Sequence, residues 1–337
     1  MEEHEHVAMR STTGSLVMLL PVYNDWDAAR VLLAHISDAL STVGLQARVI
    51  MIDDGSTDLA PGDLESAVHR GLCNVTTVRL RRNLGHQRAI AIGLALINER
   101  MPDAVVVVMD SDGEDRPSDI PRLLAKFHQG GDREIVFAQR IRRTEGPLFR
   151  IFYWLYRALH FALTGIRVQV GNFSVIPPDS LRCLVVTSDL WNHYAATVFQ
   201  SKLPYTMVPT DRGTRLMGQS HMNYVSLVTH GLSAISVFAD RVGVRVLIAA
   251  VAVLSLSVTC VAAAVGLWLT GAAVFPLWAS IAAGLALFFL LQLCLAAGMF
   301  VLLVLFGRAG TSFIPARDFH HFIIGHDHWS ASGSSRL

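Results

Sequence analysis

The sequence has 337 residues and a formal net charge of +1, and 52% of its residues are hydrophobic. A charge so close to zero argues against a protein that binds nucleic acid, and the high apolar fraction indicates a membrane portion. Residues 1–14 form a polar tail without the basic and apolar regions of a secretory signal, so we expect the domain that follows to stay in the cytosol.

Four short runs rich in β-forming residues follow in the first half of the chain. They are residues 15–20, 48–52, 75–80 and 104–109, and polar turns or helix-like segments come after each one. Strands that alternate with helices predict an α/β domain on a mainly parallel sheet, which we assign to residues 15–240. Ligands bind beyond the carboxyl ends of the strands in such sheets, so functional residues are expected directly after the runs.

Acidic and amide side chains stand at three of these places. Pro-Val-Tyr-Asn-Asp occupies residues 21–25, Asp-Asp-Gly-Ser occupies 53–56 and Asp-Ser-Asp occupies 110–112. Asn and Asp often cap helices or form turns, but three such loops on one rim indicate a binding site.

The third loop predicts a metal site. Side chains two residues apart on extended backbone point the same way, so Asp110 and Asp112 can present two carboxylates to one cation. Oxygen ligands favour Mg²⁺ or Mn²⁺, and few protein ligands imply that a substrate diphosphate completes the coordination.

The chain lacks the glycine-rich phosphate loops of dinucleotide-binding and P-loop proteins, so the metal is expected to hold the phosphates. Asp53 or Asp54 can accept hydrogen bonds from a base or a ribose. In the run 83–87, Gly85 lets the backbone approach a ligand closely.

Arginines follow the metal motif. We expect Arg140 and Arg143 to bind a phosphate of donor or acceptor, because the planar guanidinium makes two parallel hydrogen bonds. Residues 147–164 and 222–238 mix apolar, aromatic and polar residues, which predicts helices in the membrane interface. The arginines within 147–164 are expected to attract anionic lipid head groups.

Two long apolar stretches, residues 246–269 and 276–306, close the chain, and each is long enough to cross a bilayer as a helix. We expect a transmembrane hairpin at 241–308 and a cytosolic tail at 309–337. Arginines flank the outer ends of the pair and the connection between the stretches has none, so both ends are expected in the cytosol.

Neither the cysteines nor the terminal histidines predict a zinc site. The four cysteines show no paired spacing. The histidines near the end have no carboxylate or cysteine partners at ligand spacing, and a solvated or interfacial tail is expected for His320, His321, His326 and His328.

In their order and spacing, the motifs resemble those of family 2 glycosyltransferases with the GT-A fold. The matching segments are 21–25, Asp-Asp-Gly-Ser-Thr-Asp at 53–58, Arg-Asn-Leu-Gly at 82–85 and Asp-Ser-Asp-Gly-Glu-Asp-Arg-Pro at 110–117. Val-Gly-Asn-Phe at 170–173 and Arg-Gly-Thr-Arg-Leu-Met-Gly-Gln-Ser at 212–220 resemble the branch that uses polyprenyl or dolichyl phosphate. With the two spans, the resemblance covers about residues 16–306.

The resemblance implies roles for individual residues. Nucleotide-sugar contacts are implied for Pro21, Tyr23, Asp25, Asp53, Asp54, Gly85, Asp110 and Ser111, metal ligation for Asp110 and Asp112, and catalysis for Asp112 and Glu114. Contacts to phosphate or acceptor are implied for Arg140, Arg143, Asn172, Arg212, Arg215, Ser220 and His221. Three positions depart from the pattern: Asp25 stands where Glu is common, Glu114 where Gln is frequent, and His221 where Lys or Arg is frequent.

Together these features predict a membrane enzyme that moves one sugar from a nucleoside-diphosphate sugar to a polyprenyl phosphate at the cytosolic face, with inversion. A bacterial inner membrane is favoured over the endoplasmic reticulum. Glu114 and Asp115 are the nearest candidates for a general base, but a phosphate acceptor needs no strong base.

Three alternatives compete with this function. A glycosyltransferase with a hydroxyl acceptor is the first, although the chain lacks the Gln-x-x-Arg-Trp motif of processive synthases. A silent nucleotide-sugar-binding membrane protein is disfavoured because both acidic metal candidates are present. A transporter is disfavoured because the spans hold no charge. The sugar, the nucleotide, the prenyl length and the oligomeric state, a homo-oligomer included, stay open.

Overall fold

The structure is a computed structural model that describes residues 15–61, 64, 71–140, 158–166, 170–217, 224–271, 276–309 and 313–324. The chain divides into two compact units. The first combines Met1–Pro147, Gln169–Val237 and Phe313–Leu337, and the second combines Leu148–Val168 and Phe238–Ser312.

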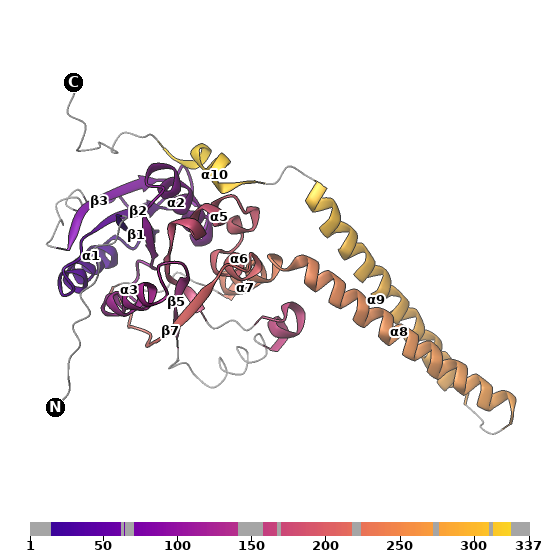
Figure 1. The fold of residues 1–337 in the computed structure, drawn as a ribbon. Coiled ribbons are helices and arrows are strands. Elements are labelled where there is room, and N and C mark those ends of the chain that lie inside the picture. The colour runs from indigo at the N-terminus through magenta and orange to yellow at the C-terminus, as the bar shows by residue number, and fades with distance from the viewer. Residues whose placement is uncertain are drawn as a thin grey trace, which may run out of the picture. The chain divides into compact units, whose positions relative to one another are not determined.

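Among the described residues, a seven-stranded sheet in the order β3-β2-β1-β4-β6-β5-β7 forms the centre of the first unit (Figure 1). The strands are β1 Leu16–Val22, β2 Ala47–Asp53, β3 Leu72–Arg79, β4 Val105–Val108, β5 Ile135–Arg140, β6 Val170–Ile176 and β7 Tyr205–Thr210. Strands β3, β2, β1 and β4 are parallel, and β6 runs antiparallel to both of its neighbours. The four strands expected from the sequence are confirmed, and they lie side by side.

Helices cover both faces of this sheet. On one face lie α1 (Trp26–Ser41) and α3 (Ile120–Gln129); on the other lie α2 (His86–Arg100), α5 (Pro178–Val185) and α6 (Tyr194–Gln200). The short elements η2 (Pro117–Asp119) and η3 (Ser188–Trp191) and the helix α7 (Tyr224–Ser236) complete the order up to the second unit. The expectation of an α/β domain with a mainly parallel sheet is therefore confirmed.

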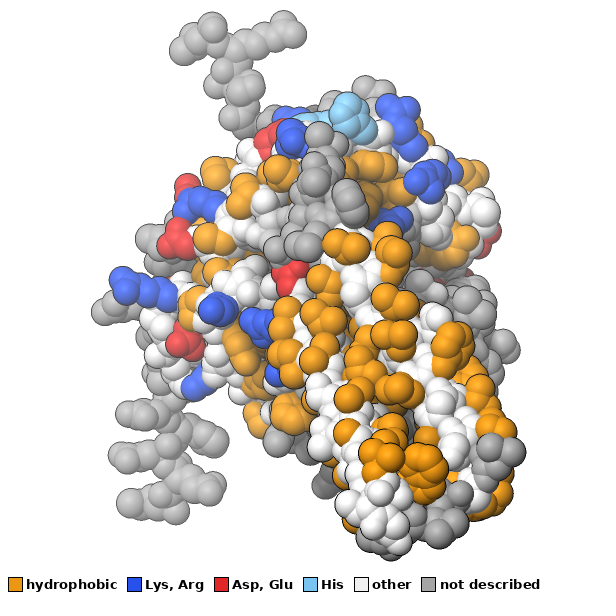
Figure 2. Space-filling model, turned by 90° about the vertical axis from the view of Figure 1, so that its right-hand side faces the viewer, with side chains coloured by type: hydrophobic (Ala, Val, Ile, Leu, Met, Phe, Trp, Pro, Cys, Tyr) orange, Lys and Arg blue, Asp and Glu red, His pale blue; other side chains and the backbone are white. Residues whose placement is uncertain are grey.

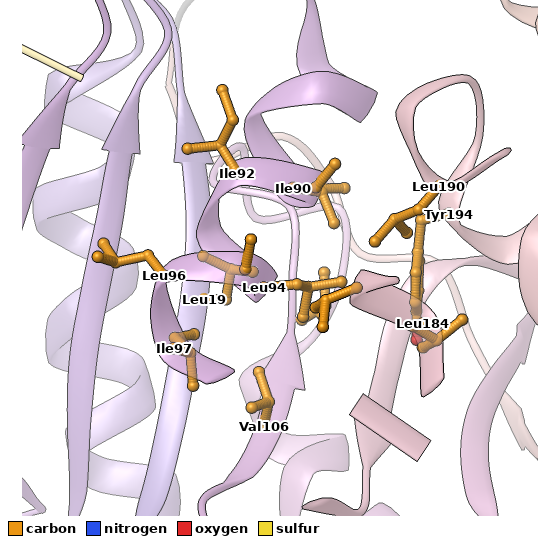
Figure 3. Close-up of a cluster of buried hydrophobic side chains, with 14 of the residues drawn as sticks. Leu19, Ile90, Ile92, Leu94, Leu96, Ile97, Val106, Leu184, Leu190 and Tyr194 are labelled. Atoms are coloured by element: carbon orange, nitrogen blue, oxygen red, sulfur yellow. The ribbon is translucent and has the colours of Figure 1, made fainter. Parts of the chain in front are cut away.

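Alternate residues of each central strand enter opposite cores, because successive side chains of a strand point to opposite faces. Leu19 of β1 packs with residues of α2, whereas Met18 and Leu20 join the core under α1 and α3. Figure 3 shows Leu19 and Val106 beside the α2 side chains. Both faces of the sheet are buried, which explains why these strands read as continuous apolar runs.

Two long apolar helices, α8 (Ala239–Leu269) and α9 (Leu277–Ala309), dominate the second unit. Within Ala239–Leu269 and Trp278–Leu303, the most apolar 18-residue windows have mean hydropathies of 2.6 and 2.5, and only 6% of each window is buried. Figure 2 shows apolar side chains along the exposed surface of the helices. A core helix of a soluble protein would be mostly buried, so exposure together with length identifies α8 and α9 as candidate membrane spans. A helix at 158–164 belongs to the same unit.

The chain returns to the first unit after α9. Residues 313–324 include α10 (Pro315–Asp318) and η4 (Phe319–Phe322), and Phe319 and Ile323 are buried in the core beside α2. The expectation of a solvated or interfacial tail is wrong for Phe319 and Ile323, whose side chains complete a core, whereas the side chains of His320 and His321 are exposed as expected. His320 contacts Glu99 of α2 at 2.8 Å. His326 and His328 lie outside the described residues.

We expect Phe319→Ala to lower the free energy of unfolding of the first unit by about 3 kcal/mol or more, because it empties a fully buried aromatic site. The matched control is Phe289→Ala on α9, a side chain that is 67% exposed, which should leave that free energy unchanged. Thermal unfolding of the full chain in detergent, followed by a probe in the first unit, measures both. Equal small effects would contradict the packing of this segment.

Candidate functional site

Four predicted site residues lie where β1, β2 and β4 end. Asp25 stands before α1, Asp53 closes β2, and Asp110 and Asp112 follow β4. Because these strands are parallel neighbours, their carboxyl ends meet at one edge of the sheet. Three acidic loops on one rim, as expected from the sequence, are therefore present.

The loops after β2 and β3 are held together by Asp54. Its Oδ1 accepts a hydrogen bond from the Leu84 N–H at 2.7 Å, and its Oδ2 accepts one from the Gly85 N–H at 2.8 Å. Burial raises the pKa of Asp54 above its usual value, although these two donors act in the opposite direction. Asp54 thus positions Gly85, the glycine expected near the ligand.

Gly55 brings the same two loops into backbone contact. Its φ of +70° lies in the left-handed region, and a Cβ there would stand 2.6 Å from the backbone of Arg82 and Asn83. Asp53 supports the turn by accepting a hydrogen bond from the Ser56 N–H at 2.8 Å. The geometry therefore requires glycine at this position.

The two carboxylates of the proposed metal motif meet different partners. Asp110 Oδ1 lies 3.0 Å from His86 Nε2 and accepts a hydrogen bond from Asn172 Nδ2 at 3.2 Å. Asp112 Oδ1 accepts one from the Glu114 N–H at 2.9 Å, and its Oδ2 lies 3.3 Å from an Arg215 nitrogen. Burial and the neighbouring charge of Asp110 raise the pKa of Asp112.

This arrangement fits a divalent cation with few protein ligands. Within the described parts of the chain, no group of three or more His, Cys, Asp or Glu side chains forms a complete metal site. Mg²⁺ and Mn²⁺ accept one or two carboxylates and take their other oxygens from water or substrate phosphates. Burial is the main cause of the raised pKa of Asp112, and the nearby charge of Asp110 adds to it; a cation bound between the two carboxylates would relieve that repulsion.

An arginine loop, residues 211–217, lies directly on the metal motif. The Gly213 N–H donates to the Glu114 carbonyl at 2.7 Å, and the Leu216 N–H donates to the Asp112 carbonyl at 3.0 Å. A Cβ on Gly213 would stand 2.7 Å from the Gly113 carbonyl oxygen, so only glycine permits this approach.

The side chains of the arginine loop pair with the acidic rim. Arg215 lies 2.6 Å from Asp25 and also contacts Asp112, and the guanidinium of Arg212 pairs with the Glu114 carboxylate. The structure thus brings together five of the residues that the resemblance implied, although they come from three distant parts of the sequence.

Sequence reasoning missed a buried relay that reaches the metal motif. The Tyr194 N–H donates to Gln87 Oε1 at 2.7 Å, and Gln87 Nε2 donates to Asn172 Oδ1 at 3.0 Å. This turns Asn172 Nδ2 toward Asp110 and His86. Gln87 belongs to the run 83–87, but its hydrogen-bond partners are 85 and 107 residues away in the sequence. No local pattern could therefore indicate its role.

His86 was also absent from the predicted site. Desolvation lowers the pKa of His86, but the carboxylates of Asp110, Asp112 and Asp54 outweigh it, so the net shift is upward. The imidazole is accordingly disposed to carry a positive charge beside the acidic rim.

The remaining predicted residues fall into two groups. Pro21 lies within the buried end of β1, Ser111 is buried, and Tyr23 is 37% exposed at the rim. The backbone of Arg140 pairs with Thr210 at the end of β5. Arg143, Ser220 and His221 lie outside the described residues.

The family model for glycosyl transferase family 2 matches residues 18–183. An undecaprenyl-phosphate 4-deoxy-4-formamido-L-arabinose transferase of Klebsiella pneumoniae subsp. pneumoniae is 34% identical over 115 residues, which cover 34% of this chain and 34% of that relative. A protein of the same description from Pseudomonas paraeruginosa is 33% identical over 155 residues, which cover 45% of this chain and 43% of the relative. The chain thus spans between a third and a half of the length of these curated relatives.

Among solved structures, glucosyl-3-phosphoglycerate synthase from Mycobacterium tuberculosis, in complex with Mn²⁺, uridine-diphosphate-glucose and phosphoglyceric acid, resembles the chain with a TM-score of 0.48. The sequences are 21% identical, and the match covers 68% of this chain and 80% of the synthase.

We expect Gly55→Ala to weaken nucleotide binding and to destabilise the first unit more than Gly44→Ala. Both glycines have a similar positive φ, so both variants cost about 1 kcal/mol of backbone strain. Only the Gly55 variant adds a clash with neighbouring backbone, worth about 1–3 kcal/mol, since a Cβ at Gly44 meets nothing within 4 Å. Thermal unfolding and nucleotide titration measure the difference, and indistinguishable variants would show that the loops do not touch.

Proposed function

Because the chain belongs to glycosyl transferase family 2, we propose that it transfers a single sugar from a nucleoside-diphosphate sugar to a polyprenyl phosphate at the cytosolic face of a membrane. The observation that carries the proposal is the meeting of Asp110 and Asp112 with the arginine loop at the carboxyl edge of the sheet. One rim therefore offers both anionic groups for a cation and cationic groups for phosphates.

The donor nucleotide is assigned to the loops after β1, β2 and β3. Tyr23 offers an exposed ring, and Asp53 offers a carboxylate to the ribose or base. Asp54 and Gly55 hold Gly85 beside these groups, where a backbone can approach the ligand. This arrangement supports a nucleotide site without a glycine-rich phosphate loop.

Asp110 and Asp112 are the proposed ligands of Mg²⁺ or Mn²⁺. A cation bound there would supply Lewis acidity to the diphosphate leaving group. Asn172 and His86 orient Asp110, and the backbone N–H of Glu114 orients Asp112, so the two carboxylates keep their places before substrate arrives.

Arg212 and Arg215 are the proposed phosphate ligands. Both guanidiniums already face the rim, where they pair with Glu114, Asp25 and Asp112. A phosphate of donor or acceptor, like a carboxylate, presents two anionic oxygens that one guanidinium can bind, and it can take over these hydrogen bonds. Arg143 and His221 are proposed for the same role.

In the proposed reaction, an acceptor phosphate oxygen attacks the anomeric carbon with inversion. A new carbon–oxygen bond forms, the bond to the diphosphate oxygen breaks, and the nucleoside diphosphate leaves with the bonding electrons. A phosphate monoester has a second pKa of about 6, so the acceptor is already anionic near neutral pH. Glu114 then serves to hold Arg212 rather than to remove a proton.

Connectivity supports a hairpin with both ends on one side of the membrane. The first unit contains Gln169–Val237, which ends just before α8, and also residues 313–324 after α9. An even number of spans between two parts of one packed unit keeps both parts in one compartment. The arginines that flank the spans favour the cytosol for this unit.

The full chain, reconstituted with undecaprenyl phosphate, Mn²⁺ and a panel of uridine- and guanosine-diphosphate sugars, should place one sugar in an organic-soluble product detected by mass spectrometry. EDTA should abolish the product, and undecaprenol should not replace the phosphate. Efficient transfer to a hydroxyl acceptor with undecaprenyl phosphate inert would overturn the proposal.

Asp112→Asn should lower turnover by about a hundredfold or more and weaken Mn²⁺ binding, because it removes an anionic ligand. Glu114→Gln, a charge-removing change two residues away, should keep substantial turnover, since the amide oxygen still accepts from Arg212. Steady-state kinetics and Mn²⁺ titration measure both variants. A thousandfold loss in the Gln variant with metal and donor binding intact would point to a general base and thus to a hydroxyl acceptor.

A further inference from the structure

We propose that the segment of residues 313–324, termed the C-terminal strap, is a positioning element of the donor site that fixes the backbone of residues 79–85. The inference rests on the proposed function, because it assigns a role in nucleotide binding. It concerns a part of the chain that follows both candidate spans and that the sequence placed in a solvated tail.

Backbone hydrogen bonds join the strap to the chain just beyond β3. Leu80 and Ile323 form an antiparallel bridge. The Ile324 N–H donates to the Arg79 carbonyl at 2.9 Å, and the Arg81 N–H donates to the Phe322 carbonyl at 2.8 Å. The strap therefore holds residues 79–81 in the manner of an added strand.

The same residues are held on their other side by residues 53–56 at the end of β2, termed the donor loop because the nucleotide is assigned in part to them. The Leu80 N–H donates to the Asp53 carbonyl at 2.8 Å, and the Arg79 guanidinium donates to the Ser56 carbonyl at 3.2 Å. A few residues further on, Asp54 binds the N–H groups of Leu84 and Gly85. Residues 79–81 thus lie between the strap and the donor loop, and Leu84 and Gly85 are bound to Asp54 of the same loop.

Buried side chains anchor the strap. Phe319 is fully buried and Ile323 is 5% exposed, so the backbone between them has little freedom. The ring centroid of Trp191 lies 4.0 Å from that of Phe313 and 5.1 Å from that of Phe322. The guanidinium carbon of Arg88, on the first turn of α2, lies 5.3 Å from the ring centroid of Trp191. The aromatic rings that anchor the strap therefore also contact the helix that carries His86 and Gln87.

Because the strap follows the hairpin in the sequence, truncation before the hairpin also removes the strap. The strap is the first described segment after α9. Residues 79–81, which contact the donor loop, are therefore held by a segment that follows the hairpin in the sequence. A catalytic unit cut off after Asp240 lacks this brace, and its nucleotide affinity should fall even though every motif residue is present. The hairpin then contributes to the donor site as well as to membrane attachment.

A proline substitution tests the brace in the full chain. Ile324→Pro removes the N–H that donates to Arg79, while Ile323 already has the extended conformation, with φ of −88° and ψ of 137°, that a following proline requires. Ile324→Ala is the matched control, because it shortens a side chain that is 48% exposed and keeps the N–H. Phe313→Ala is a second variant, which weakens the anchor at Trp191 without touching residues 79–85.

Three measurements follow each variant: titration with uridine and guanosine diphosphate in the presence of Mn²⁺, hydrogen–deuterium exchange of residues 79–86, and thermal unfolding. We expect Ile324→Pro to weaken binding of the preferred nucleotide by about fivefold, the order expected for one lost hydrogen bond, and to raise exchange in residues 79–86. Phe313→Ala should shift both in the same direction by less, Ile324→Ala should stay within twofold of the parent, and the Michaelis constant for undecaprenyl phosphate should not change.

Two results would overturn the inference, and they differ from one another. If the parent binds a nucleotide and Ile324→Pro binds it equally well below its unfolding temperature, the strap is merely structural while the proposed function stands. If the parent binds neither nucleotide, the proposed function fails first and the donor-site role of the strap falls with it.

Discussion

Carboxylates crowd together where β1, β2 and β4 end, and the surrounding chain is arranged to balance their charge. Asp25, Asp54, Asp110 and Asp112 stand on this edge because parallel strands deliver their following residues to the same side of a sheet. Unpaired carboxylates with little exposure are costly. Backbone N–H groups meet Asp54 and Asp112, Arg215 meets Asp25, and the side chains of His86 and Asn172 meet Asp110.

These compensating groups are of two kinds, and the difference has a functional consequence. The N–H groups that meet Asp54 are part of the backbone, so they fix loop geometry and are not free to leave. The guanidiniums of Arg212 and Arg215 sit on side chains, and phosphates can compete for them. Backbone contacts at Gly213 keep the arginine loop on the metal motif while its side chains exchange partners.

The two candidate membrane spans lie between two parts of the first unit in the sequence. The hairpin interrupts the first unit between Val237 and Phe313, and the chain that returns from it completes a core and pairs with residues 79–81. The two units thus differ in composition, since the long apolar helices belong to the second, and their segments alternate along the sequence. A single cut before α8 therefore removes part of the first unit together with the hairpin.

The sequence by itself determined the parts that depend on local patterns: the four parallel strands with their apolar runs, the acidic residues that follow them, and the two long apolar helices. Each of these features is set by residues within one strand or helix, so periodicity and composition reveal it. Segments 170–176 and 205–210 gave no such clear signal, because glycine and asparagine interrupt the first and proline interrupts the second, and pairing with the rest of the sheet decides their state. Three features follow only from the tertiary structure. They are the hydrogen bonds that link Tyr194 through Gln87 to Asn172, the position of Arg215 between Asp25 and Asp112, and the pairing of the strap with residues 79–81. The contacts that form these three features join residues from 85 to more than 200 positions apart, for example 190 for Arg215 with Asp25 and 240 for Arg81 with His321, and no local pattern records such a partner.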